Sequence, residues 1–125
     1  MLLTTALIIT SRSQAQDKAK WKEMEDFHTV MAATFHPSEE GKLDPIKKKS
    51  QEMVDKAVAW QQSTPPASYD KNAVKSSLKK LVSGAKEINK LVKNNAVDNV
   101  LKEKLSALHD VFHEIMEKCE KEDHM

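Results

Sequence analysis

Apolar residues recur at intervals of three and four along most of this 125-residue chain, which is the spacing of one face of an α-helix. Four segments show this pattern, and short stretches rich in proline, glycine, asparagine or serine separate them. The pattern predicts helices at about residues 17–35, 45–62, 71–93 and 97–121. Four long helices joined by short loops predict an all-α fold, an antiparallel up-down-up-down four-helix bundle.

Each segment carries one apolar stripe that we expect to face the bundle core. In the first segment the stripe is Trp21, Met24, His28, Met31 and Phe35, with Phe27 beside it. The later stripes are Ile46, Ser50, Met53, Ala57 and Trp60; then Val74, Leu78, Leu81, Ala85, Ile88 and Val92; then Leu101, Leu105, Leu108, Phe112, Ile115 and Cys119.

Local signals set the expected helix ends. Pro37 should end the first helix, because proline disfavours helical geometry in the residue before it. Asp44 followed by Pro45 reads as a cap with proline at the first helical position. Either Asp70 or Asn72 is expected to cap the third helix.

The N-terminus has the features of an export signal. Leu2 to Ile9 form an apolar run that is too short to span a bilayer, which takes about 20 residues. Ser13 and Ala15 then place small residues at the two positions that a signal peptidase reads. We therefore predict a signal peptide at residues 1–15 and a bundle at residues 16–125, periplasmic or secreted, with no membrane insertion of the mature chain. The alternative is an N-terminal helix docked on the bundle.

Composition and charge exclude several classes of partner and cofactor. The chain has 20 basic and 19 acidic residues, a net charge of +1, and its only arginine, Arg12, lies in the predicted signal. Removal of the predicted signal leaves 19 lysines, 19 acidic residues and no arginine, so nucleic acid is not an expected partner. Cys119 is the only cysteine, so neither an internal disulfide nor a covalent c-type haem attachment is available.

Histidines provide the candidate chemistry. His109 and His113 are four residues apart and share one face of the last helix, while His28 lies on the seam of the first. At 1.5 Å per residue, His28 lies about 12 Å and His109 about 18 Å from the same end of the bundle, so the three rings should converge inside it. Imidazole binds zinc, copper and nickel. We therefore predict a metal site formed by His28, His109 and His113, with His36 as the fourth ligand.

Other side chains are candidates for supporting roles at this site. Met24, Met31, Glu40 and Asp110 are alternatives to His36 as the fourth ligand. Asp110 and Glu114 are also expected to accept hydrogen bonds from the ring N–H groups.

No catalytic motif accompanies the histidines. The string His109-Asp110-Val111-Phe112-His113 has aspartate where the H-E-x-x-H protease motif needs its general-base glutamate. The sequence contains no Gly-rich phosphate loop. We expect a protein that is not an enzyme.

The bundle pattern, the Ser63-Thr64-Pro65-Pro66 stretch that closes the second helix, and the histidine-bearing string LHDVFHEI at residues 108–115 carry a resemblance to a known family. Over residues 17–121 the chain resembles the periplasmic four-helix-bundle cytochromes, namely the soluble b-type cytochrome and cytochrome c prime. This resemblance implies that Met24 and His113 match the methionine and histidine ligands of a non-covalent haem b. His28 and His109 have no counterpart in that ligand pair.

Three functions remain open at this point. The leading one is a metal-binding protein that buffers, carries or senses zinc or copper, with the metal ion and a redox or metal-transfer protein as partners. The second is an electron-transfer cytochrome with haem b held by Met24 and His113. The third is a structural or interaction module without a ligand. An oligomer is compatible with all three.

Overall fold

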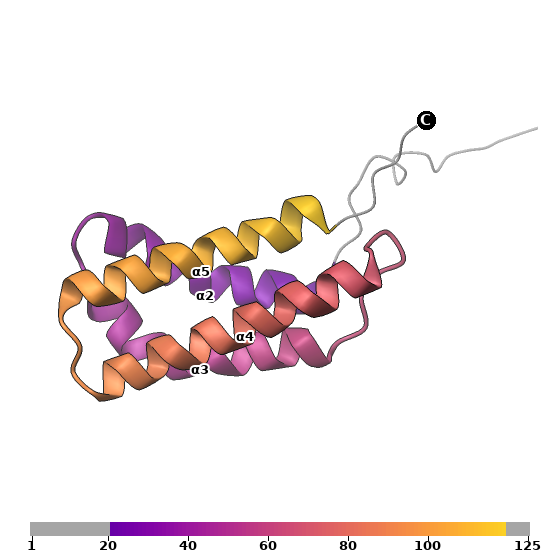
Figure 1. The fold of residues 1–125 in the computed structure, drawn as a ribbon. Coiled ribbons are helices and arrows are strands. Elements are labelled where there is room, and N and C mark those ends of the chain that lie inside the picture. The colour runs from indigo at the N-terminus through magenta and orange to yellow at the C-terminus, as the bar shows by residue number, and fades with distance from the viewer. Residues whose placement is uncertain (1–20, 120–125) are drawn as a thin grey trace, which may run out of the picture.

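The computed structural model describes residues 21–119, which form four helices. They are α2 (Lys22–Glu39), α3 (Asp44–Gln62), α4 (Lys71–Lys93) and α5 (Asp98–Lys118), shown in Figure 1. The predicted all-α four-helix fold is confirmed. None of the described helices is long and apolar enough to cross a membrane.

The helices are arranged in a ring. Each packs against the next in the chain, and α5 closes the ring against α2, so that α2 and α4 lie on a diagonal. Ser50 early in α3 bonds Asn89 late in α4 (2.8 Å), and Ser77 early in α4 bonds Glu114 late in α5. These contacts join the start of one helix to the end of the next, so neighbours run antiparallel, and Figure 1 shows the connecting loops at alternating ends.

The end of α2 differs from the prediction. The helix continues through Pro37 to Glu39, so the expected end at residue 35 is wrong. Gly41 adopts the left-handed conformation (φ +84°), its N–H bonds the Ser38 carbonyl, and the Lys42 N–H bonds the Pro37 carbonyl, each at 2.9 Å. This is the usual glycine stop of an α-helix. Pro37 lies inside this last turn and has no N–H, so the turn lacks the hydrogen bond to the Ala33 carbonyl.

Two helix starts also refine the prediction. α3 begins at Asp44 itself, with Leu43 in the N-cap position and no side-chain cap bond, so the expected cap at Asp44 is wrong. α4 begins after Asp70, whose carboxylate accepts hydrogen bonds from the Asn72 and Ala73 N–H groups. Residues 1–20 and 120–125, with the predicted signal, the expected outer ends of the first and last helices, and His124, lie outside the described residues.

The core follows the predicted stripes in three of the four helices. Every stripe position of α3 and α5 is buried, Cys119 included, and so is every stripe position of α4 except the half-buried Val92. In α2 the buried face is rotated by one residue relative to the predicted stripe, so Phe27 is fully buried and His28 is exposed. Burying the apolar phenylalanine ring is favourable, whereas burying imidazole without a hydrogen-bond partner is costly.

Candidate functional site

A continuous row of aromatic and imidazole rings joins α2 and α5, and its members are surface rings except for the buried Phe112. Each ring contacts the next, with ring centres between 3.8 and 5.8 Å apart. In order along its length, the row is His36, Phe35, His109, His113, Phe112 and His28. We call it the ring row. All four histidines predicted as ligands therefore belong to one row of contacting rings, but His28 joins it only through the buried Phe112.

His109 and His113 are the two imidazoles that the fold brings together. They are one helical turn apart on α5, and their ring centres are separated by 4.5 Å at an interplanar angle of 67°. The His109 ring is held from the other side by Phe35 of α2, which stacks on it with centres 3.8 Å apart and planes within 2° of parallel. A cross-helix stack thus fixes one ring, while α5 sets its separation from the other.

The surroundings of His109 favour its neutral form. Partial burial lowers its pKa, and the nearby His113 and His36 lower it further, while Asp110 and Glu39 act in the opposite direction. A neutral imidazole has a nitrogen lone pair free for a metal ion. His109 is therefore ready to act as a ligand at neutral pH.

His113 has a hydrogen-bond partner on its own helix. Its Nδ1 lies 2.9 Å from Oε2 of Glu117, and the side chains are 41 % and 59 % exposed. A ring that donates from Nδ1 to a carboxylate leaves Nε2 as the acceptor, which is the usual second-shell arrangement around metal-bound histidine. The contact with Glu117 orients the His113 ring, and in the tautomer with the proton on Nδ1 it leaves Nε2 available.

The expected convergence of three imidazoles inside the bundle is wrong. His28 and His36 are exposed, and His109 and His113 are only partly buried. Within residues 21–119, no three His, Cys, Asp or Glu side chains lie close enough together to hold a metal ion. His28 stacks on Phe112 with ring centres 5.1 Å apart.

The other predicted ligands and supporting groups have different neighbours. Met31 is 1 % exposed in the core. Glu40 lies 3.6 Å from the Lys42 ammonium. Glu114 faces α4, where its carboxylate accepts hydrogen bonds from Ser77 and Lys80. These are the partners found for Glu114 in place of the expected histidine ring. Asp110 is exposed and acts on His109 through its charge.

The two residues expected as haem ligands, Met24 and His113, lie on α2 and α5. The Met24 sulfur accepts a hydrogen bond from the Tyr69 hydroxyl at 3.8 Å. Between α2 and α5, the Phe27 and Phe112 rings pack with centres 5.9 Å apart, and both are buried.

Two residues of the site were not predicted from the sequence. Glu117 follows His113 by four residues, a spacing that places side chains on one helix face and could have been noticed. Phe35 was expected only as a core residue, and no local signal indicates that it stacks on a ring 74 positions away. Comparisons with protein-family models, curated proteins and solved structures find no match for this chain.

Proposed function

We propose that this protein binds one transition-metal ion, zinc or copper, on the α2/α5 ring row, with His109 and His113 as its two principal ligands. The observation that carries the proposal is the imidazole pair with ring centres 4.5 Å apart. With metal–nitrogen bonds of about 2.0–2.1 Å, two imidazoles on one tetrahedral ion have their centres about 5 Å apart. A small side-chain adjustment is enough to close such a pair on an ion.

His36 is the third ligand in this proposal. Its charge affects the pKa of His109, and both rings contact Phe35. His36 is exposed near the end of α2, so rotation of its side chain toward the pair disturbs no core packing. His28 is the weaker candidate, because it lies at the opposite end of the ring row.

Such a site leaves coordination positions to water or to a partner's ligand. An incompletely enclosed ion suits buffering, carriage or sensing, in the periplasmic or secreted setting that the N-terminal segment predicts. A metal-transfer protein could offer a further ligand at this exposed face. The role is that of a binding protein rather than of an enzyme.

Calorimetric titration of tag-free protein with zinc and with copper tests the proposal. We expect one ion per chain. Glu117→Gln removes a hydrogen-bond partner of a ligand and should weaken metal binding by roughly 10–100-fold. His109→Ala and His113→Ala remove the ligands themselves and should each weaken metal binding by more than that. His28→Ala is the matched control and should bind normally.

Three results would overturn the metal assignment. The first is the absence of heat with both metals. The second is equal loss in His28→Ala and His109→Ala. The third is a Soret band in the purified protein that disappears in Met24→Ala, which would assign the haem function instead.

A further inference from the structure

Charge is segregated between the helices although the whole chain is nearly neutral. α4 contains seven lysines and one glutamate, a formal charge of +6. α2 contains one lysine and four acidic residues, a formal charge of −3, and α5 has three lysines and five acidic residues, which gives −2. Because α2 and α4 lie on a diagonal of the bundle, the molecule has one basic side and one acidic side.

Six of the α4 lysines form a single stripe. At 100° per residue they fall within an arc of about 100° on the outward side of the helix, and they extend over about 33 Å. All six are exposed, and they are Lys71, Lys75, Lys79, Lys86, Lys90 and Lys93. We call this surface the lysine face.

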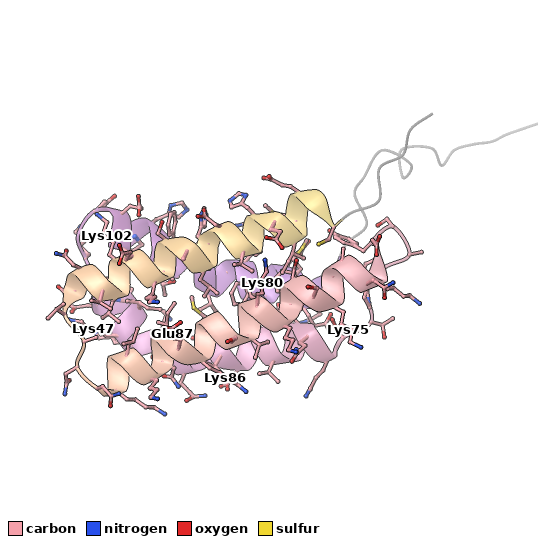
Figure 2. The ribbon with its side chains drawn as sticks, viewed as in Figure 1. Lys47, Lys75, Lys80, Lys86, Glu87 and Lys102 are labelled. Carbon is pink, nitrogen blue, oxygen red and sulfur yellow. The ribbon has the colours of Figure 1, made fainter. Side chains whose placement is uncertain are left out.

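The lysine face has no acidic partners among residues 21–119, whose ion pairs all involve other cations. Lys80, the remaining lysine of α4, lies outside the stripe and pairs with Glu114 of α5 at 3.1 Å. Figure 2 shows Lys80 between α4 and α5, whereas Lys86 lies on the other side of α4. The six ammonium groups are therefore available to an external anion.

An apolar groove lies beside one end of the lysine face. It has a volume of about 480 Å³ and runs between the end of α3 and the start of α4. Pro65 and the buried Val74 and Leu78 supply apolar walls. The other lining residues are polar, and they are Gln61, Gln62, Ser63, Lys71 and Lys75. A ligand that suits it has a hydrocarbon part beside an anionic group, as an anionic phospholipid has.

We propose that the lysine face of α4 docks this protein on an anionic lipid bilayer. A straight row of lysines can meet a flat surface along its whole length, and each lysine near an anionic leaflet contributes attraction. The groove would accept lipid tail at one end of the row. Neither arginine nor an aromatic ring lines the groove, so the surface lacks the stacking and bidentate groups of a nucleic-acid site.

This orientation leaves the ring row accessible. The acidic α2 helix, diagonal to α4, points away from the bilayer, and repulsion from the anionic leaflet reinforces the same orientation. The attachment is peripheral and electrostatic. It does not depend on metal binding.

Co-sedimentation of the full chain with vesicles tests the proposal. We expect binding to vesicles of equimolar phosphatidylglycerol and phosphatidylcholine, and none to phosphatidylcholine alone. Raising the salt from about 0.05 M to about 0.5 M should release the protein, because screening shortens the reach of surface charge. Glycerol phosphate in solution, which is the headgroup without its bilayer, should not compete.

Two triple variants with equal charge change separate the lysine face from net charge. Lys75→Gln, Lys79→Gln and Lys86→Gln together should lower the partition coefficient by about 100-fold, at about fivefold per lysine. The control carries Lys22→Gln, Lys42→Gln and Lys102→Gln, none of which lies on α4, and it should lose much less.

Several outcomes would refute the proposal. Failure to bind anionic vesicles at low salt, binding to neutral vesicles, or equal loss in the two triple variants would each do so. Tighter, salt-sensitive binding of single-stranded DNA than of vesicles would assign the lysine face to nucleic acid instead. Circular dichroism of both variants verifies that each is folded.

Discussion

Asp70 is the clearest point at which one side chain sets a helix boundary. Its Oδ1 accepts hydrogen bonds from the N–H groups of Asn72 (3.0 Å) and Ala73 (3.1 Å), which have no partner inside α4. Its own N–H bonds the Cys119 carbonyl at 2.8 Å, so the same residue ties the start of α4 to the end of α5. A substitution of Asp70 removes the side-chain bonds but keeps the backbone bond, so it measures what the side chain alone contributes to stability.

The magnitude follows from two terms. Loss of a helix cap costs about 0.5–2 kcal/mol of unfolding free energy, and loss of a negative charge at a helix N-terminus costs about 0.3–1 kcal/mol. Asp70→Ala removes both and should cost about 1–3 kcal/mol in total. Asp70→Asn keeps an oxygen acceptor and should cost only about 0.3–1 kcal/mol. The backbone bond to Cys119 is the same in both variants.

Urea unfolding followed by tryptophan fluorescence measures these differences, since Trp21 and Trp60 are both buried. Asn72→Ala is the matched control. The Asn72 side chain is exposed and makes no hydrogen bond within residues 21–119, so its loss should change stability by less than about 0.5 kcal/mol. If Asn72→Ala costs as much as Asp70→Ala, or if Asp70→Ala is neutral, the assignment of the cap is wrong.

Two further predictions concern the rings. Phe112→Ala should lower the unfolding free energy by about 3–5 kcal/mol, because removing a ring that is only 1 % exposed leaves a cavity. Phe35→Ala should cost less, because that ring is half-buried. Equal losses of unfolding free energy in urea would contradict this packing. Because burial lowers the pKa of His109, the unfolded chain binds this proton more readily, and stability should fall as pH drops from about the ordinary value of 6.5 through the lowered folded pKa. As the pH falls, the wild type should therefore lose unfolding free energy relative to His109→Gln. A difference between the two proteins that does not change with pH would refute this.

Much of the fold could be predicted from apolar spacing because the inward stripes of α3, α4 and α5 are strongly periodic. The errors arose where two signals compete. At the end of α2, Pro37 suggested a stop, but the left-handed Gly41 sets the end one turn later. In α2 the spacing admits either Phe27 or His28 on the inner face, and the cost of burying imidazole decides for phenylalanine.

The candidate site was predictable only in part for a related reason. The His109/His113 pair depends on spacing within one helix, and the structure places the two rings side by side. The contribution of α2 depends on how far that helix is turned about its axis, and a rotation of one residue moves His28 from the core to the surface. Glu114 shows the same sensitivity, since it follows His113 by one residue yet faces α4.

The near-zero net charge of the chain conceals an uneven distribution of charge over the folded surface. Summed over the sequence, it argues against binding to polyanions. In the folded chain, α4 gathers lysines on one side while α2 and α5 carry the acids. A local field can therefore be strong where the total charge is nearly zero.

The most direct test of the metal site is long-range ¹H–¹⁵N NMR of the histidine side chains during a zinc titration of tag-free protein. We expect the His109 and His113 signals to change together and to saturate at one zinc per chain. His113 should coordinate through Nε2 and keep its Nδ1 proton on Glu117. Saturation with both of these rings unchanged, or with His28 as the main responder, would contradict the proposed site.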